Sequence, residues 1–243
     1  MTAPDSRPPK KKPPERHHRH RDVQGGWLRP AVFGAMDGLV SNFALIAGLA
    51  GGQADRKVVI LAGLAGLASG AFSMGAGEYV SVASQSELAE AEIEVERREL
   101  ERHPAAERAE LAALYEERGL SPELAAEVAE ALHRDPKEAL EVHTREELGV
   151  VPGELPSPVL AALSSFASFS VGAVLPVLPY LLGASSLWPA AIVAAVGLFS
   201  AGALVSRVTA RPWWFSGLRQ FTFGATAALL TYGIGALIGV SGL

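Results

Sequence analysis

The chain has 243 residues, of which 49% are hydrophobic and 19% charged, and its formal net charge is −5. Its mean hydropathy of +0.23 suits either a large soluble domain or a small membrane protein, so composition alone leaves the class open. The chain has no cysteine, which excludes disulfides and thiolate ligands. Any metal must use carboxylate, imidazole, thioether, carbonyl or water ligands, a set that favours iron(II), manganese(II) and similar ions.

Charge divides the chain into four regions. Residues 1–26 are rich in Pro, Lys, Arg and His, which predicts a disordered basic tail. Two apolar regions, 27–86 and 153–243, flank an acidic region at 87–152, where 19 of the 26 acidic residues lie between 87 and 147. We expect membrane-spanning helices in the two apolar regions and a cytoplasmic helical domain in the acidic one.

Five apolar segments reach the roughly 20 residues that a helix needs to cross a bilayer. They are 30–52, 57–84, 158–182, 185–208 and 215–240. The predicted fold is therefore all-α: a polytopic membrane protein with five transmembrane helices and a small domain inserted between the second and third. Positive residues precede the first span and flank the last two, which places the N-terminus and the inserted domain in the cytoplasm. Arg56 and Lys57 are the contrary evidence.

Breaker residues divide the acidic region into helices. Pro104 breaks or restarts the first, Gly119 ends the second, Ser121 caps the third before Pro122, and the last opens at Asp135 and is closed by Gly149. The predicted helices are 87–103, 105–118, 122–133 and 136–148.

Three side chains within the spans are candidates for an ion path. Asp37 lies among apolar residues of the first span, where an ionisable group costs roughly 2.5–3.5 kcal/mol on insertion scales. Met74 and Glu78 are spaced i, i+4 in the second span, so a thioether and a carboxylate share one helix face. In the structural alternative, Met74 only fills space between helices and Glu78 is an acidic residue at the membrane interface.

Paired carboxylates in the acidic region are candidates for a metal site. Glu96 with Glu99, and Glu107 with Glu110, are spaced i, i+3 on either side of Pro104. His143 and Glu147, spaced i, i+4 in the last helix, could add a nitrogen and an oxygen. If these helices pack together, the pocket suits iron(II), manganese(II) or zinc(II). A solvated surface of Arg and Glu pairs explains the same spacing equally well.

Four motifs show a resemblance to a known family. They are Asp37–Asn42, Ser73–Val82 with Ser84 and Gln85, Tyr115–Ser121, and Arg145–Gly149. The sequence resembles the vacuolar iron transporters from Trp27 to the C-terminus. The resemblance implies a homodimer of five-span subunits with the ion path at the dimer interface. It also implies a cytoplasmic three-helix domain that collects metal for export in exchange for protons.

Carried over by position, the resemblance implies roles for individual residues. Asp37 and Met74 would line the path, with Glu78 near its cytoplasmic mouth. The implied metal ligands are Glu96, Glu99, Glu107, Glu110 and Glu147. Two departures bear on mechanism: Gly66 replaces an acidic residue of plant members, which affects proton coupling, and His143 with Thr144 replaces methionines, which affects metal preference.

The resulting hypothesis is a transporter, and not an enzyme, that exports iron(II) from the cytoplasm in exchange for protons. Manganese(II), zinc(II) and cobalt(II) are further candidate ions, and no cofactor is expected. The expected partners are metal ions, protons, membrane lipid and a second copy of the chain, with no nucleic acid. The alternatives are a membrane-anchored ferritin-like iron oxidase and a metal sensor without transport. The Ala, Gly and Arg bias favours a bacterial plasma membrane, with a vacuolar membrane as the alternative.

Overall fold

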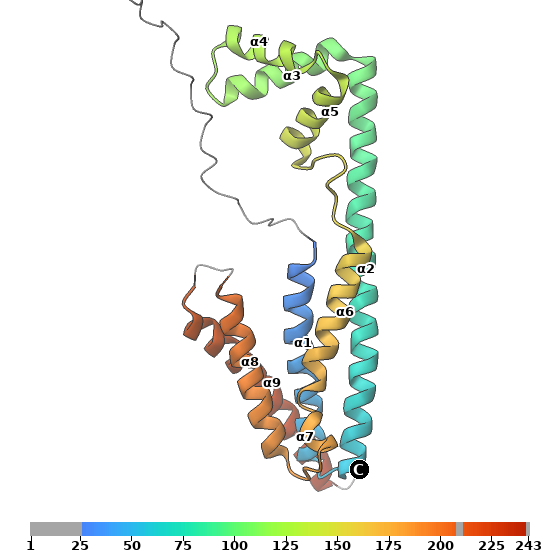
Figure 1. Ribbon diagram of the computed structural model, residues 1–243, viewed down its shortest axis with the longest axis vertical. Coiled ribbons are helices and arrows are strands. Elements are labelled where there is room, and N and C mark those ends of the chain that lie inside the picture. The colour runs from blue at the N-terminus through green and yellow to red at the C-terminus, as the bar shows by residue number, and fades with distance from the viewer. Residues whose placement is uncertain (1–25, 208–210, 242–243) are drawn as a thin grey trace, which may run out of the picture.

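The computed structural model describes residues 26–207 and 211–241, so the predicted basic tail lies outside the described residues apart from Gly26. The described residues form helices and no strand. The elements are α1 Leu28–Gly51, α2 Arg56–Arg102, α3 Pro104–Glu117, α4 Pro122–Leu132, α5 Pro136–His143, the π-helical turn η1 Thr144–Leu148, α6 Pro158–Val174, α7 Leu178–Leu181, α8 Leu187–Val205 and α9 Trp213–Ser241. Helices α3, α4 and α5 gather at one end of the molecule, and the apolar helices form a bundle at the other (Figure 1).

Helix α2 runs through both parts of the molecule. It has 47 residues, which corresponds to about 70 Å, and it passes the predicted region boundary at 86/87 without a break. The composition changes there from apolar to charged, but no Gly or Pro occurs between Gly77 and Pro104. Gly and Pro are the residues that most often interrupt a helix. The change of composition therefore makes one half of α2 suit lipid and the other half suit water, while the helical backbone continues.

Within the described residues, four helices are long and apolar enough to cross a membrane: α1, α2, α8 and α9. The third predicted span, 158–182, is instead divided into the 17-residue α6, a turn, and the four-residue α7. Pro176 and Pro179 explain the division, because proline lacks the amide hydrogen and disfavours helix in the residue before it. The first, fourth and fifth predicted spans agree with helix bounds to within a few residues, whereas the helix that begins at the second continues to Arg102.

Helix α1 is the centre of the bundle. In its most apolar window 44% of the residues are buried, against 11% in α9, and it packs against α2, α6, α8 and α9. Small residues allow the closest contacts: Gly172 of α6 lies against the carbonyl oxygen of Ala35, and Gly235 of α9 against that of Gly48. Packing through glycine is typical of helices in lipid, where apolar surface alone gives no drive to associate.

Polar groups of the bundle are used to join its helices. The Asn42 amide of α1 donates hydrogen bonds to the carbonyl oxygens of Gly63 in α2 (3.1 Å) and Ala173 in α6 (2.6 Å). The Thr231 hydroxyl of α9 donates to Ala44 of α1 at 2.6 Å. The backbone of these helices is thus linked by side chains in a region where water is excluded.

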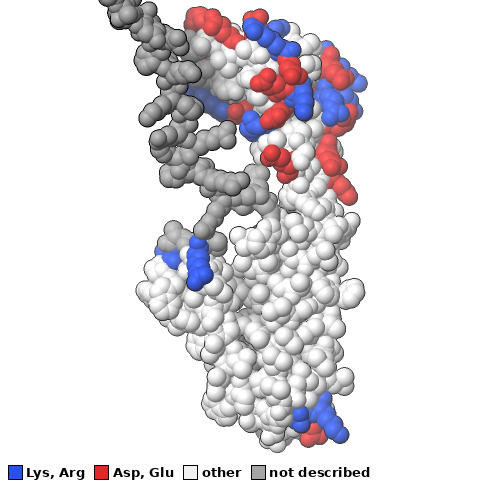
Figure 2. All heavy atoms as spheres, viewed as in Figure 1, with Lys and Arg blue, Asp and Glu red and all other residues white. Residues whose placement is uncertain are grey.

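Charged residues leave a wide uncharged band on the visible face of the molecule (Figure 2). Acidic and basic side chains cover the part formed by α3, α4, α5 and the far half of α2, and a small group appears at the opposite tip. Arg56 at that end of the bundle donates to the carbonyl oxygens of Tyr180 (2.8 Å) and Leu181 (3.4 Å). Its guanidinium therefore satisfies carbonyl groups at the end of α7.

Close packing between α1 and α6 can be tested at Gly172. Replacement by Ala should raise intrinsic helix propensity, yet a Cβ there would overlap the Ala35 carbonyl oxygen. We expect Gly172→Ala to destabilise the protein by about 1–3 kcal/mol, seen as earlier thermal unfolding in detergent. Gly233→Ala in α9 is the matched control, because nothing lies within 4 Å of a Cβ there. Equal unfolding temperatures for both variants would contradict the packing described.

Candidate metal centre

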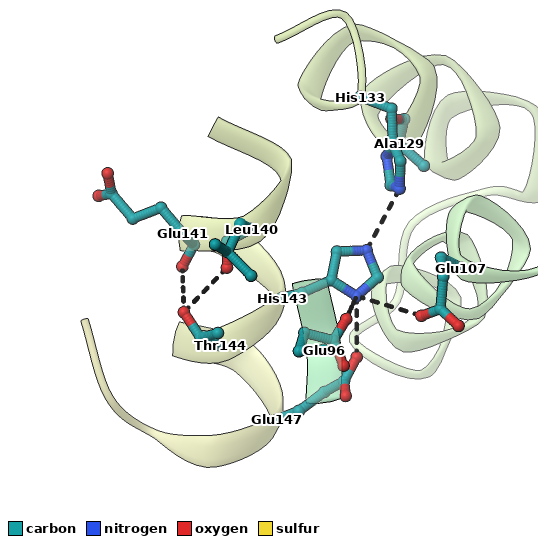
Figure 3. A network of polar contacts seen from close by, with 9 residues as sticks. All are labelled: Glu96, Glu107, Ala129, His133, Leu140, Glu141, His143, Thr144 and Glu147. Carbon is teal, nitrogen blue, oxygen red and sulfur yellow. Dashed lines mark hydrogen bonds and ion pairs between the residues drawn. The ribbon is translucent and has the colours of Figure 1, made fainter. Parts of the chain in front are cut away.

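Four side chains from different helices converge beyond the apolar bundle (Figure 3). Glu96 comes from the far half of α2, Glu107 from the first turn of α3, His143 from the end of α5, and Glu147 from η1. One ligand atom from each lies within 4.8 Å of all the others. We call these four residues the carboxylate–histidine cluster.

The centre of the cluster is Nδ1 of His143. It lies 3.0 Å from Oε1 of Glu147, 3.1 Å from Oε1 of Glu96 and 3.8 Å from Oε2 of Glu107. Ligand atoms at about 2.1 Å from one small cation are themselves roughly 3.0–3.4 Å apart at octahedral or tetrahedral angles. The cluster is therefore close to the size of a single coordination sphere.

The cluster is buried enough for its charges to interact strongly. His143 is fully buried, and Glu107 is 8% exposed. Burial, the nearby Glu147 charge, and further charges on Glu107 and Glu110 raise the pKa of Glu96 to about 7, against the opposing effect of His143. Burial also raises the pKa of Glu107, with the Glu110 charge as the next cause. Oε1 of Glu96 is buried without a hydrogen bond, so this oxygen is available to a cation.

Local sequence explains how the helices bring these residues together. Pro104 begins α3 directly after His103 ends α2, so the chain turns sharply and Glu107 is returned toward Glu96. Ser121 caps α4 through the amide of Leu124, and Asp135 caps α5 through that of Lys137. Proline occupies the first position of all three helices, where its missing amide hydrogen has no cost.

The last helical turn differs from the predicted α-helix. Residues 144–148 form the π-helical turn η1, which ends at Gly149 with φ of 69°. An ion pair between Arg118 at the end of α3 and Glu146 fixes this turn to the rest of the domain. Its effect is to lower the pKa of Glu146, chiefly through the hydrogen bond from Arg118. Such π-turns are frequent at functional sites.

Two of the six predicted ligands lie outside the cluster. Glu99 is 3.8 Å from Nε2 of the exposed His103, and Glu110 is exposed. Both still act on the cluster through charge: Glu99 raises the pKa of Glu107, and Glu110 raises that of both Glu96 and Glu107. They form an acidic outer edge to the cluster.

Two further residues adjoin the cluster: Thr144, which the family resemblance links to metal preference, and His133, which no motif of the sequence indicated. The hydroxyl of Thr144 donates to the carbonyl oxygens of Leu140 (2.9 Å) and Glu141 (3.3 Å), so it is directed away from the cluster. His133, at the end of α4, has its Nε2 3.3 Å from Nε2 of His143. Its position ten residues before His143, at the end of the predicted helix 122–133, is a signal too weak to identify it.

The three predicted path residues lie in the apolar bundle. Gly38, the neighbour of Asp37, and Met74 both pack against α6 around Phe169 and Ala173, so Asp37 and Met74 are at a similar level. Asp37 is partly buried and has no ion-pair partner among residues 26–207 and 211–241. Glu78 follows Met74 by one turn of α2, toward the carboxylate–histidine cluster.

Position 66 differs from the pattern that the family resemblance implies. A Cβ on Gly66 would lie 3.0 Å from Oδ1 of Asn42 and 3.0 Å from Leu45. This oxygen of Asn42 is buried and has no hydrogen-bond partner. An acidic side chain at position 66 would therefore meet Asn42 first, and in this chain Asp37 and Glu78 are the acidic residues of the predicted spans.

Comparison with known proteins agrees with these features. The long apolar helices mark the chain as a membrane protein. Residues 28–236 match the family model described as the VIT family, and the chain belongs to this family. A vacuolar iron transporter of Acanthamoeba castellanii is 40% identical over 233 residues, covering 90% of this chain and 82% of that protein. Vacuolar iron transporter 1 of Oryza sativa subsp. japonica is 31% identical over 224 residues, with 90% and 89% covered.

Metal affinity should depend on pH through Glu96. A proton and a metal ion compete for this carboxylate, whose pKa is about 7, so protonation below pH 7 weakens binding. We expect affinity for iron(II) or its substitute cobalt(II) to fall by roughly tenfold from pH 8 to pH 6. Titration of the full chain in detergent at several pH values measures this. An affinity that is constant between pH 6 and pH 8 would rule out a role for Glu96 as a ligand.

Two substitutions distinguish metal binding at the cluster from attraction of metal by the acidic surface. Glu96→Gln should weaken metal binding by about tenfold or more, because it removes one charged ligand of a buried group. Glu94→Gln is the control: Glu94 lies on the same helix but is exposed and pairs with Arg97 at 3.0 Å. Isothermal titration with cobalt(II) compares the two. If both substitutions weaken binding equally, the metal is attracted by overall charge and not by the cluster.

Proposed function

We propose that the protein transports iron(II), or a related divalent ion, out of the cytoplasm in exchange for protons. The observation that carries this proposal is the position of the carboxylate–histidine cluster at one end of α2, whose apolar half carries Met74 and Glu78. The relatives are named as vacuolar iron transporters, which favours transport over the oxidase and sensor alternatives. In this proposal the cluster collects the ion, and Glu78, Met74 and Asp37 pass it onward.

A fifth membrane crossing is part of the proposal. Helix α6 lies between α1 and α2, with its start next to Ser86, whose hydroxyl donates to the Pro156 carbonyl oxygen at 3.2 Å. The turn and α7 that follow reach the opposite end, where Arg56 donates to Tyr180. Together α6 and α7 cover the same length of the bundle as the neighbouring spans. The chain then crosses five times, with the helical domain inserted between crossings two and three.

Orientation follows from charge at the two ends of the bundle. Arg29 is the second residue of α1, Arg211 lies just before α9 and Arg219 lies near the start of α9, at the end of the bundle that faces the helical domain. We place this end in the cytoplasm by the positive-inside rule. Arg56 lies at the other end, where its hydrogen bonds to the end of α7 account for its presence.

Proton exchange is assigned to Asp37 and Glu78. With Gly66 in place of an acidic residue, these two carboxylates are the acidic groups of the predicted spans. A carboxylate surrounded by apolar groups is readily neutralised, so protonation would release the metal ion and carry a proton inward. The exchange therefore needs fewer titratable groups than the family pattern implies.

A homodimer would place the ion path between two copies of α2. The apolar half of this helix exposes Leu61 (71%), Phe72 (73%) and Val80 (62%), and nothing lies within 4 Å of a Cβ on Gly77. Such a face suits lipid or a second subunit, and the small residues near Met74 allow close approach. Which membrane the dimer occupies, a bacterial plasma membrane or a vacuolar one, does not alter this topology.

His143 bears on the choice of ion. An imidazole nitrogen with three carboxylates is a harder ligand set than one with thioether sulfur, so manganese(II), zinc(II) and cobalt(II) are further candidate substrates. Competition of these ions with iron(II) at the cluster would rank them.

Transport is tested with purified protein in liposomes that contain a metal-quenched dye. Under an imposed pH gradient, we expect iron(II) to enter with wild-type protein and entry to fall at least tenfold with Asp37→Asn, which keeps the shape but removes the charge. Asp55→Asn is the control, because Asp55 lies just before α2 at the end of the bundle and is exposed. Metal that binds without entering, with or without the gradient, would favour the sensor or oxidase alternative.

A further inference from the structure

The side of His143 that faces away from the carboxylates makes one further contact. Its Nε2 lies 3.3 Å from Nε2 of His133, and the two rings are perpendicular, with an interplanar angle of 89° and centroids 5.1 Å apart. Figure 3 shows the two nitrogens of His143 in opposite surroundings: one faces His133, and the other faces Glu96, Glu107 and Glu147. His133 belongs to the end of α4, the helix that supplies none of the four cluster residues.

The hydrogen-bond partners of His133 determine where its proton lies. Its Nδ1 is 2.8 Å from the carbonyl oxygen of Ala129. A carbonyl oxygen can only accept, so Nδ1 of His133 carries the hydrogen and donates it. In a neutral imidazole the other nitrogen then has a lone pair and no hydrogen, so Nε2 of His133 is an acceptor facing His143.

This acceptor selects the tautomer of His143. Nε2 of His143 must carry the hydrogen to donate to Nε2 of His133, which leaves the lone pair of His143 on Nδ1. That lone pair is directed at carboxylate oxygens 3.0 Å and 3.1 Å away. Electron-rich atoms at such distances need a hydrogen or a cation between them, and a metal ion bound to Nδ1 would supply the cation.

We propose that His133 is a positioning residue for the metal centre: with Ala129, it holds His143 in the tautomer that presents Nδ1 to the ion. This inference rests on the proposed function, since it assumes that the carboxylate–histidine cluster binds metal. Without an acceptor at position 133, His143 can instead carry its hydrogen on Nδ1 and donate it to Glu147. That hydrogen bond would have to break before a metal ion could bind, so the site would be preorganised for a proton and not for a metal.

The fold supports a rigid placement of His133. It is the residue directly after α4, and its backbone amide donates to Ala129, so both its backbone and its ring are attached to the last turn of that helix. Ala129 is fully buried where α4 packs against α3. Only Arg134 and Asp135 separate His133 from α5, whose far end carries His143. Helix α4 thus contributes to the metal centre through a second layer of contacts, as ligating histidines generally require.

Two substitutions of His133 test the inference in the full chain in detergent. His133→Leu fills similar space without an acceptor, and we expect it to lower affinity for zinc(II) by roughly 10–100-fold. His133→Gln keeps an acceptor oxygen near the position of Nε2 and should retain most of the affinity. His103→Leu is the matched control, because His103 is exposed and lies beside Glu99 outside the cluster.

Nitrogen NMR of histidine-labelled protein gives a readout that a purely structural role would not change. In wild-type protein loaded with zinc(II), we expect metal-bound Nδ1 and protonated Nε2 for His143. In the metal-free protein, His133→Leu should lower the population of the His143 tautomer that carries hydrogen on Nε2. His133→Gln should restore that population.

The outcomes distinguish the inference from the function on which it rests. If wild-type protein binds zinc(II) with no dependence on Glu96, the metal centre itself is wrong. If zinc(II) binding depends on Glu96 but His133→Leu binds as tightly as wild type, His133 does not position His143. If His133→Gln loses as much affinity as His133→Leu, and both lower the unfolding temperature of the metal-free protein equally, the role of His133 is only structural and the inference is overturned.

Discussion

Repulsion among closely placed carboxylates, one of them buried and one partly buried, is the interaction that organises the helical domain. Glu96, Glu107 and Glu147 come from three different elements and would separate if each were free to reach water. The fold keeps them together, and the cost is visible in the pKa of Glu96, which burial and the neighbouring charges raise to about 7. His143 is placed among them with one nitrogen toward the carboxylates. A divalent cation reverses the sign of every one of these interactions, which is why the arrangement favours metal over an empty acidic surface.

The bundle solves a different problem, since it must associate without help from the hydrophobic effect. It does so through glycines that bring backbones together, as at Gly172, and through hydrogen bonds from side chains to carbonyl oxygens of other helices. Asn42 and Thr231 both use this second device. Asp37 differs from Asn42 and Thr231, because within residues 26–207 and 211–241 it makes no hydrogen bond or ion pair to another helix. That contrast supports a role for Asp37 in the ion path.

Much of the fold could be predicted because it follows from local chemistry. Apolar length gave the positions of the spans, and Pro104, Pro122 and Pro136 gave the helix starts of the acidic domain. The division of the third span was missed because length and hydropathy outweighed Pro176 and Pro179 in the prediction. Spacing paired Glu96 with Glu99 and Glu107 with Glu110, since both members share a helix face. Which member of each pair faces inward depends on how α2, α3 and α5 pack, and this long-range packing has no local signal. His133 was missed for the same reason.

The continuity of α2 ties the metal centre to the bilayer. Met74 and Glu96 are 22 residues apart on one helix, or about 33 Å. No Gly or Pro follows Gly77 in this helix. A helix whose apolar half is longer or shorter than the local hydrocarbon layer responds by tilting. A tilt of about 10° moves the position of Glu96 sideways by roughly 6 Å relative to Met74, by simple geometry on a rigid helix. Membrane thickness can therefore change where the carboxylate–histidine cluster lies relative to the lipid surface.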